Sequence, residues 1–260
     1  VIDNNSNDGS IDAIKSQFSN VKIYENTENI GFSKAVNQGA KKATGKYLLL
    51  LNPDTKLIED NIFEIYTFLE KHDSVAVLGP ALVTESGSTQ QSYWKKPTLM
   101  STILSIYHLD FLNPEKNYKY KNHNKLLTVD AVSGGAFFVR RKIFNDLNGF
   151  NTDLFWMEDI EFCLRVKHAG FEVIYYPNKK IIHYKGKSAE KNWQVAISNQ
   201  LLSKIKYFKL RHSRMQTSIL KIAILIIALI KSIFFLILSP FGLAYKDKKE
   251  GYLVVIKSIL

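Results

Sequence analysis

Residues 47–51 read YLLLL and run directly into the turn Asn52-Pro53-Asp54-Thr55. A short run that is apolar on both faces is typical of a strand buried in the middle of a parallel sheet. Pro53 fixes its own φ and restricts Asn52, so the turn is stiff. Ligands of open α/β sheets bind just beyond the carboxyl ends of the strands, where Asp54 would lie. The alternative is a plain turn, because Asn, Pro and Asp all favour turns.

The segments around this strand alternate between helix-like and strand-like patterns. Ser10 suits the N-cap of the first helix, and Gly45 suits the end of the second. The alternation predicts an α/β fold with a doubly wound, mainly parallel sheet flanked by helices. Residues 84–124, rich in Ser, Gln, Lys, Asn and Tyr, interrupt the pattern as an insert or lid. We expect helices over residues 11–18, 32–43, 59–71, 158–168 and 189–210, and strands or extended segments over residues 21–24, 75–80, 129–141 and 171–177.

Charge is distributed unevenly along the 260 residues, whose formal net charge is +11. Residues 204–260 hold 11 Lys and Arg against 2 Asp and Glu, whereas residues 1–203 hold 24 against 22. We therefore expect a nearly neutral domain over residues 1–203 and a basic tail over residues 204–260. The neutral domain argues against nucleic-acid binding, and the tail indicates contact with an anionic surface.

The tail contains an apolar run, Ile222–Leu238, with Lys231 at its middle. As a helix its 17 residues extend about 25 Å, which is short of a bilayer core of about 30 Å. A central Lys opposes insertion by about 2.5–3.5 kcal/mol, and basic residues flank both ends of the run, so both flanks prefer the cytoplasm. We rank re-entrant or in-plane attachment to the cytoplasmic face of the membrane first, a single span second and a soluble packing helix third. Pro240 and Gly242 end the helix.

The start of the chain and its cysteine content indicate whether the sequence is a fragment and in which redox compartment it occurs. Val1 and Ile2 resemble the end of a strand that is already under way, so we expect the N-terminus of the natural protein to be missing. Cys163 is the single cysteine, so no disulfide forms within the chain, as suits a reducing compartment.

The polar loop DNNSNDGS, residues 3–10, follows this first strand. Its side chains Asp3, Asn5 and Asp8 could hold a polar ligand together with backbone N–H groups. The alternative is a set of Asx turns that lead into a helix.

A second polar segment, NIGFSKAVNQG, contains Gly31, Asn37 and Gly39. Gly31 permits a positive φ or a close approach of the backbone to a ligand. Asn37 and Gly39 are poor helix formers within an expected helix, which indicates selection for another role. At Gly39 the alternative is close helix packing.

The segment FWMEDIEFCLRVKHAGF places Trp156 and other apolar residues before Glu158 and Asp159. Apolar surroundings raise the pKa of a carboxyl group and suit it to general-base catalysis. The alternative is that the acids only stabilise a helix N-terminus. Glu161 and Arg165, at i and i+4, are expected to form a surface ion pair.

Asp54, with Asn52 beside it, is a candidate ligand for Mg²⁺ or Mn²⁺. These cations often take few protein ligands and complete their shell with water and phosphate oxygens. His183 follows an apolar run and precedes Lys-Gly-Lys, where it could be a metal or phosphate ligand or a structural residue.

Six motifs occur in order over Val1–Ser188: DNNSNDGS, NIGFSKAVNQG, LLLLNPDT, VSGGAFFVRR, GFNTDLFWMEDIEFCLRVKHAGF and IIHYKGKS. Together they resemble the family 2 glycosyltransferases, and most of all their rhamnosyltransferase-like branch, in which NPD replaces the usual Asp-x-Asp. The resemblance implies a GT-A fold and an inverting transfer from a nucleotide-sugar.

The resemblance also implies roles for individual residues. Asp159 matches the catalytic base, Asp54 the metal-binding acid that bridges to the diphosphate, and His183 a residue that helps to hold the metal or diphosphate. Asp3 matches the acid that contacts the nucleotide base. The implied donor side comprises Asp3, Asn5, Asp8, Gly31, Asn37, Asn52 and Asp54, and the implied acceptor side comprises Gly134, Gly135, Trp156 and Glu158.

We therefore expect a sugar, with rhamnose as the candidate, to pass from a UDP- or dTDP-linked donor to a hydroxyl of a glycan. A membrane site would make this a lipid-linked glycan in cell-surface polysaccharide synthesis. The reaction requires Asp54 and Asp159 to face one cleft. The alternatives are a nucleotidyltransferase, which would need a Gly-rich basic phosphate loop that this sequence lacks, and a non-catalytic nucleotide-sugar-binding or scaffold protein.

Overall fold

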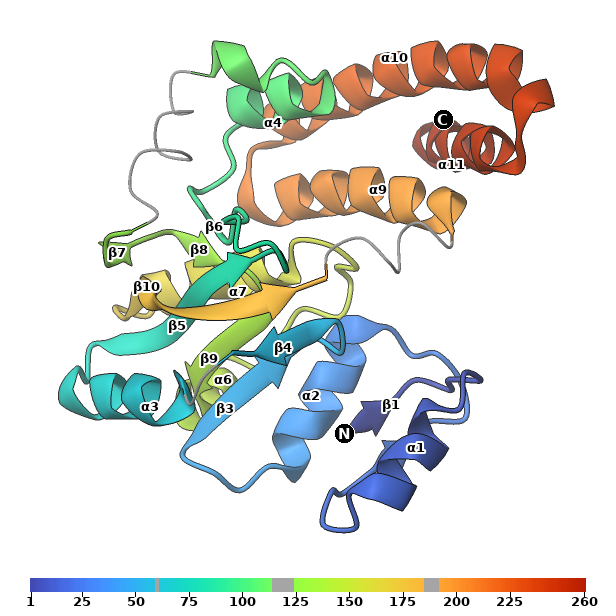
Figure 1. Ribbon diagram of the computed structural model, residues 1–260. Coiled ribbons are helices and arrows are strands. Elements are labelled where there is room, and N and C mark those ends of the chain that lie inside the picture. Colours follow the sequence, from blue (N-terminus) through green and yellow to red (C-terminus); the bar gives the residue numbers. More distant parts are fainter. Residues whose placement is uncertain (59–60, 114–123, 185–191) are drawn as a thin grey trace.

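The computed structural model describes residues 1–58, 61–113, 124–184 and 192–260. Its centre is a 6-stranded sheet, whose strands lie side by side in Figure 1. The strands follow the order β3 (Tyr47–Leu51), β9 (Ala136–Arg140), β5 (Val75–Val83), β10 (Glu172–His183) and β4 (Thr55–Leu57), and β7 (Leu127–Thr128) also pairs with β10.

The sheet is mixed. β5 and β10 are parallel, but β9 enters between β3 and β5 and is antiparallel to both. β4 and β7 are also antiparallel to β10. The strands β3, β5 and β10 thus run in one direction, as the alternating pattern predicts. The strand β9, which follows the long segment after β5, runs in the opposite direction.

The YLLLL strand packs apolar side chains on both faces, but the prediction that it lies in the middle of a parallel sheet is wrong, because β3 is an edge strand of the described sheet and its neighbour β9 is antiparallel. Leu48 and Leu50 pack into the core on one face, and Leu49 packs on the other. Leu51, at the end of β3, is 42% exposed. An apolar run indicates that both faces of a strand are packed against other elements. It does not indicate whether the strand is hydrogen-bonded to another strand on each side.

Helices cover both faces of the sheet. α3 (Asn61–Lys71) packs on one face, and α2 (Phe32–Lys42), α6 (Arg141–Asp146) and α7 (Glu158–His168) pack on the other. The bounds of α7 match the predicted helix, and α2 differs from its prediction by one residue. α2 ends at Lys42 with Ala43 as its C-cap, so Gly45 does not form the helix end. The predicted start of the third helix, at residue 59, lies outside the described residues.

The N-terminal segment forms a separate two-stranded parallel sheet from β1 (Ile2–Asp3) and β2 (Tyr24–Glu25), with α1 (Ser10–Gln17) between them. Ser10 is the first residue of α1, and Gly9 is its N-cap, so the predicted Ser10 cap is wrong. A Cβ on Gly39 would lie 3.2 Å from Ile2 Cγ1, so Gly39 serves close packing of α2 on β1.

The segment after β5 contains the short strands β6 (Tyr93–Trp94) and β8 (Ala131–Val132), which pair with each other, and the helix α4 (Leu99–Ile106). A 3-10 turn, η1 (Asp110–Leu112), follows α4. Residues 114–123 of the predicted insert lie outside the described residues.

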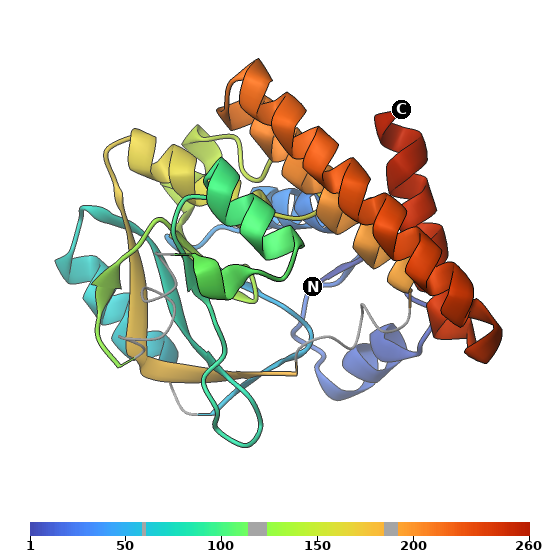
Figure 2. The same ribbon diagram turned by 90° about the horizontal axis from the view of Figure 1, so that it is seen from above.

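A layer of helices lies above one end of the sheet (Figure 1). It comprises α4, α9 (Trp193–Arg211), α10 (Arg214–Leu238), the 3-10 turn η2 (Ser239–Phe241) and α11 (Leu243–Ile259). Figure 2 shows α4 lying along α10, and the Tyr107 hydroxyl donates to the Ala223 carbonyl oxygen at 2.9 Å. The predicted boundary between residues 203 and 204 falls inside α9, and the start predicted for this helix at residue 189 lies outside the described residues.

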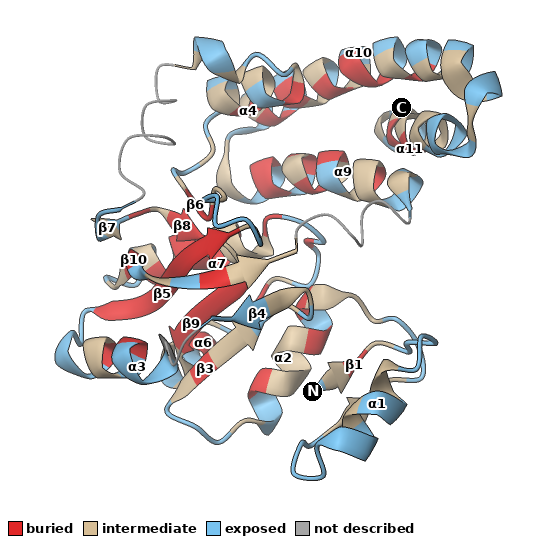
Figure 3. Ribbon diagram, viewed as in Figure 1, coloured by how far each residue is buried: buried red, intermediate tan, exposed pale blue. Residues whose placement is uncertain are grey.

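The helical layer shares a core with the sheet domain. Leu154, Met157 and Leu164, from the loop before α7 and from α7 itself, pack with Leu201, Ile205 and Phe208 of α9 and with α10. One face of α10 is buried in this core, as the red turns in Figure 3 show. The basic tail is therefore packed onto the sheet domain.

The opposite face of α10 is exposed and apolar. This outer face of α10 comprises Met215, Ile219, Ile222, Ile226, Leu229, Ile230, Ile233, Phe234, Leu236 and Ile237. By length and composition, Arg214–Phe241 is the single segment among the described residues that is suited to crossing a membrane. Gly242 separates α10 and η2 from α11, as the Pro240 and Gly242 pattern predicts.

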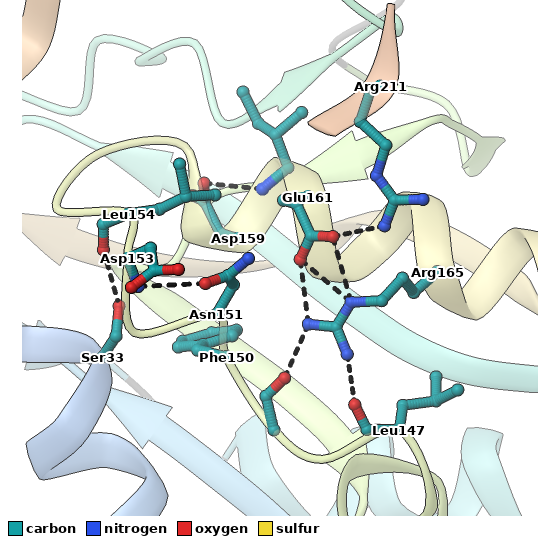
Figure 4. A network of polar contacts seen from close by, with 12 residues as sticks. Ser33, Leu147, Phe150, Asn151, Asp153, Leu154, Asp159, Glu161, Arg165 and Arg211 are labelled. Atoms are coloured by element: carbon teal, nitrogen blue, oxygen red, sulfur yellow. Dashed lines mark hydrogen bonds and ion pairs between the residues drawn. The ribbon is translucent and has the colours of Figure 1, made fainter. Parts of the chain in front are cut away.

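A buried ion-pair network fixes α7 against the tail (Figure 4). The Glu161 side chain is only 4% exposed and accepts hydrogen bonds from Arg165 of its own helix and from Arg211 at the end of α9. Arg165 also donates to the carbonyl oxygens of Leu147 and Gly149. The predicted surface pair of Glu161 and Arg165 is thus a buried one, because α9 covers this side of α7.

We predict that Glu161→Gln lowers the free energy of unfolding by roughly 2–4 kcal/mol. Removing one partner of a buried pair leaves uncompensated charge, and the two guanidinium groups are about one-fifth exposed, which reduces the penalty. Urea denaturation measures the change. The control Asp146→Asn removes an exposed i, i+4 pair with Lys142 and should change stability by less than about 0.5 kcal/mol. Equal effects of the two variants would contradict a structural role for the network.

Candidate active site

A cavity of about 730 Å³ lies between the sheet and the helical layer. It is lined by seven of the residues that the sequence singled out, namely Asn52, Gly134, Gly135, Trp156, Glu158, Asp159 and His183. These residues come from four separate segments of the chain. Asp54 is not part of the lining, so the structure does not show Asp54 and Asp159 facing one cleft as predicted; Asp54 instead contacts His183, which does line the cavity.

Asp159 is held in place by backbone N–H groups. Gly134 N donates to its Oδ2 at 2.8 Å, and Ile160 N donates to its Oδ1 at 2.7 Å. Met157, the N-cap of α7, has φ 73°, a left-handed conformation that is uncommon for a side chain of this size. This turn sets the direction in which Glu158 and Asp159 leave the loop and enter the cavity wall.

The two acids form a poorly solvated pair. Burial raises the pKa of Glu158 to about 8, and the neighbouring charge of Asp159 adds to the increase. Glu158 Oε2 is buried and has no hydrogen-bond partner among the described residues. Burial also raises the pKa of Asp159, while the N–H groups of Gly134 and Ile160 oppose that increase. Carboxyl groups with raised pKa values are suited to proton transfer near neutral pH.

The segment Gly134-Gly135 separates the acid pair from His183. A Cβ on Gly134 would lie 3.5 Å from Asp159 Oδ2, and a Cβ on Gly135 would lie 3.6 Å from His183 Nε2. The Gly135 carbonyl oxygen accepts from Asn52 N at 3.0 Å, which ties the segment to the Asn-Pro-Asp turn. Two glycines thus let Asp159 and the histidine approach one stretch of backbone from its two sides.

Asp54 and His183 form the other half of the site. Asp54 Oδ1 lies 3.4 Å from His183 Nε2, and the two side chains are 25% and 14% exposed. The Asp54 carbonyl oxygen accepts from Tyr184 N at 2.8 Å, so β4 and the end of β10 hold the pair together.

Gln90 fixes the tautomer of His183. Its amide nitrogen donates to the His183 carbonyl oxygen at 2.6 Å, so its Oε1 must be the atom 3.1 Å from His183 Nδ1. Because an amide oxygen only accepts, Nδ1 carries the proton and donates. In the neutral imidazole Nε2 then has its lone pair toward Asp54, which is the arrangement found in metal-binding histidines.

These residues fit a divalent cation. Neighbouring ligands of an octahedral ion bound at about 2.1 Å lie about 3 Å apart, close to the Asp54–His183 separation. Asn52 Oδ1 is buried in the same region without a hydrogen-bond partner among the described residues. No group of three or more His, Cys, Asp or Glu side chains suited to a metal occurs in the described part of the chain, so the site offers two strong protein ligands.

The predicted donor residues of the N-terminal segment are only partly consistent with ligand binding. Asp3 is buried, and hydrogen bonds from Ser6 lower its pKa. Asn5 and Gly31 have φ values of 66° and 86°, and Gly31 confirms the predicted positive φ. Asn4 joins the two loops by donating from its side-chain amide to the Gly31 carbonyl oxygen at 3.3 Å.

Asn37 and Asp8 make structural contacts within the protein. The Asn37 side chain accepts from Phe150 N and donates to the Phe150 carbonyl oxygen, both at 2.8 Å, so it ties α2 to the loop before α7. Asp8 Oδ1 accepts from Ser10 N at 3.1 Å, as in the Asx-turn alternative. The donor role predicted for these two residues is therefore not supported by the geometry.

Sequence patterns did not identify Gln90 or Lys204, which both line the cavity. Gln90 lies in the Ser- and Gln-rich segment after β5, where no spacing signal marks it. Lys204 belongs to α9 and was counted with the basic tail. Only the packing of α9 over the sheet brings it to the cavity.

Comparisons with known proteins agree with the resemblance that the sequence motifs indicate, because the matches are glycosyltransferases. The sequence profile described as Glycosyl transferase family 2 matches residues 1–147, and the profile described as N-terminal domain of galactosyltransferase matches residues 116–187. The N-acetylglucosaminyl-diphospho-decaprenol L-rhamnosyltransferase of Mycobacterium tuberculosis is 24% identical over 212 residues, which cover 72% of this chain and 66% of that protein. The rhamnosyltransferase WbbL of Escherichia coli is 29% identical over 153 residues, covering 57% of this chain and 56% of WbbL.

Solved structures agree on the fold. The mannosyltransferase PcManGT of Pyrobaculum calidifontis, solved with GDP-Man and Mn²⁺, has a TM-score of 0.55 at 14% identity and covers 99% of this chain and 76% of that one. TarS of S. aureus, solved with UDP, has a TM-score of 0.51 at 15% identity, covering 99% and 80%. These neighbours confirm the predicted GT-A fold. Because the first profile spans more than half of the sequence, the chain belongs to glycosyl transferase family 2.

Proposed function

We propose that this glycosyltransferase moves a sugar, with rhamnose as the candidate, from a nucleotide-diphosphate donor to a hydroxyl of a lipid-linked saccharide, with inversion. The observation that carries the proposal is the position of Asp159 and of the Asp54–His183 pair on two sides of Gly134-Gly135. In this arrangement Asp159 supplies a base and the Asp54–His183 pair supplies a site for a cation and its bound diphosphate, and both lie next to Gly134-Gly135. The relatives named as rhamnosyltransferases, one of them with a diphospholipid-linked acceptor, support the sugar and the acceptor class.

Asp159 acts as the general base in this proposal. Its carboxylate accepts the proton of the acceptor hydroxyl while that oxygen attacks the anomeric carbon. The bond between the anomeric carbon and the diphosphate oxygen breaks in the same step, so the configuration inverts. Burial raises the pKa of Glu158 to about 8, so Glu158 keeps its proton at neutral pH, while the N–H groups of Gly134 and Ile160 favour the ionised form of Asp159.

Asp54, His183 and Asn52 hold the donor diphosphate in this proposal, with Asp54 and His183 as ligands of Mg²⁺ or Mn²⁺. When bound, the cation would offset the negative charge that develops on the leaving diphosphate. Gln90 keeps Nε2 of His183 available by holding the proton on Nδ1. Asp3, Asn5 and Gly31 contact the UDP- or dTDP-linked nucleotide, and Gly134, Gly135 and Trp156 contact the acceptor.

The outer face of α10 attaches the enzyme to the cytoplasmic face of the cell membrane. Exposed apolar surface on this scale is unusual for a soluble monomer. The other side of the helix is packed in the core with α9 and α11, which favours a helix lying in the membrane plane. An enzyme held this way meets a lipid-linked acceptor where that acceptor resides, as cell-surface polysaccharide synthesis requires.

We predict that Asp159→Asn lowers kcat by about 10²–10⁴-fold, because the amide cannot accept the hydroxyl proton. Donor affinity should stay within about threefold. Radiolabelled dTDP-rhamnose transfer to membrane acceptors measures turnover, and calorimetry measures donor binding. The control Asp153→Asn changes an exposed acid of the same loop and should keep full activity. Near-normal turnover of Asp159→Asn would remove this residue from the mechanism.

We predict that Asp54→Ala weakens Mn²⁺ binding by at least about tenfold and abolishes metal-dependent UDP binding, because one of two protein ligands is lost. Electron paramagnetic resonance of free Mn²⁺ gives the metal affinity directly. Asp12→Ala, on the exposed side of α1, is the charge-matched control. An unchanged Mn²⁺ titration would refute the role of Asp54.

We predict that Glu158→Gln makes stability less dependent on pH. A folded-state pKa of about 8 means that the folded protein keeps a proton which the unfolded chain releases above about pH 4.5. The wild-type free energy of unfolding should therefore fall, relative to Glu158→Gln, as the pH rises from about 4.5 to 8, and the difference should be constant above that range. Thermal denaturation at successive pH values tests this. Parallel pH curves for the two proteins would show that Glu158 is not desolvated.

A further inference from the structure

We propose that Lys204, together with Lys95 and Lys96, forms a subsite for a phosphate or diphosphate group on the acceptor. The three residues line the cavity that contains Asp159 and are called the lysine side of the cavity below. The inference rests on the proposed function for the identity of the acceptor side, and it adds the chemical class of the group that the acceptor must carry.

Lys204 lines the cavity near the acid Asp110, whose charge acts on it. Among the described residues no hydrogen bond or ion pair to its ammonium group occurs. Burial lowers its pKa, and the charge of Asp110, at the start of η1, only partly opposes this. A poorly solvated ammonium group that has no hydrogen-bond or ion-pair partner among the described residues is unfavourable for folding, so its presence in the cavity indicates an anionic ligand.

The position of Lys204 relative to the acid pair assigns the subsite to the acceptor. Trp156 N donates to Ser203 Oγ at 3.2 Å, which fixes the turn of α9 that carries Lys204 beside the loop that begins α7. Lys204 therefore lies on the Asp159 side of the site, and the Asp54–His183 pair lies beyond Gly134-Gly135. In an inverting displacement the nucleophile and the leaving group occupy opposite faces of the sugar ring.

Neutral donors accompany the lysines. Gln200 and Lys204 are four residues apart on α9 and line the cavity together, and Ser105 of α4 lines it as well. The oxygens of a phosphate group accept hydrogen bonds from both ammonium and neutral donors.

The surroundings of α4 indicate how a lipid would leave this subsite. α4 presents Ser105 to the cavity and packs along α10 through Tyr107. Met100, Phe111 and Leu112, on α4 and the turn after it, are exposed and apolar. A phosphate group on the lysine side would thus lie close to an apolar edge that adjoins the outer face of α10, as Figure 2 shows for α4 and α10.

Pyrophosphate binding in the presence of EDTA tests the subsite without the metal-dependent donor site. We expect the full chain to bind inorganic pyrophosphate in calorimetry and Lys204→Met to bind it at least about tenfold more weakly. The matched control Lys71→Met, at the exposed end of α3, should bind within about twofold of wild type. Equal pyrophosphate affinities of Lys204→Met and wild type would overturn the inference.

Two further measurements separate a binding role from a structural one. Lys204→Arg, which keeps the charge, should retain pyrophosphate affinity within about threefold. Lys204→Met should unfold at the same temperature as wild type or higher, because Lys204 makes no hydrogen bond or ion pair within the part of the chain that the structure describes. Loss of affinity in Lys204→Arg with an intact fold, or a clear fall in the unfolding temperature of Lys204→Met, would contradict the proposal.

A last comparison identifies the source of the phosphate. We expect citronellyl diphosphate, a short prenyl diphosphate, to bind more tightly than pyrophosphate and to lose affinity in Lys204→Met, with no such loss for phosphatidylglycerol vesicles or for UDP with Mn²⁺. An equal loss for UDP with Mn²⁺ would assign Lys204 to the donor, and an equal loss for vesicles would assign it to lipid headgroups; either result overturns the acceptor subsite. The Asp54→Ala and Asp159→Asn experiments do not depend on Lys204, so failure of this inference and failure of the proposed function are distinguishable.

Discussion

The hydrogen bond from Gly134 N to Asp159 is the contact on which the arrangement of the site depends. It holds a poorly solvated carboxylate against a backbone segment without side chains, and the other side of that segment faces His183. A Cβ at Gly134 would be in van der Waals contact with Asp159, and a Cβ at Gly135 would be in contact with His183 and close to Leu82, so both positions leave little room for a larger side chain. The Gly135 carbonyl oxygen then anchors the Asn-Pro-Asp turn through Asn52 N, so one two-residue segment positions the acid pair, the histidine and the turn that carries Asp54.

The tail takes part in this arrangement through α9. Glu161, two residues after Asp159 on α7, is held by Arg165 and by Arg211 of α9, so the helix that presents the acid is clamped between the sheet and the helical layer. Ser203 of the same helix accepts from Trp156 N in the loop before α7. The helices that present an apolar face to solvent are thereby connected to the loop and helix that carry Asp159, as the proposed use of a lipid-linked acceptor requires.

Several features of the fold and site were predictable from the sequence because they are local. The acidic start and Gly-terminated end of α7 gave its bounds, and the positive φ of Gly31 followed from the absence of a side chain. The motifs in order identified the family, and the family profile confirms it. Local patterns failed where distant segments compete for a residue. Asn37 was predicted to bind the donor but is engaged by Phe150, and the Glu161–Arg165 pair was predicted on the surface but is covered by α9.

By itself the sequence determined the chemistry that is available: which carboxyl, imidazole and glycine residues exist, on which turns and helix ends they lie, and that the positive charge collects in the tail. The tertiary structure alone decided which of them meet. It placed β3 at the edge of the sheet, brought Gln90 to His183, and turned Lys204 from one of many tail lysines into a cavity residue. The physical reason is that backbone conformation and helix periodicity are encoded within a few residues, whereas burial and pairing depend on contacts between segments that no local pattern specifies.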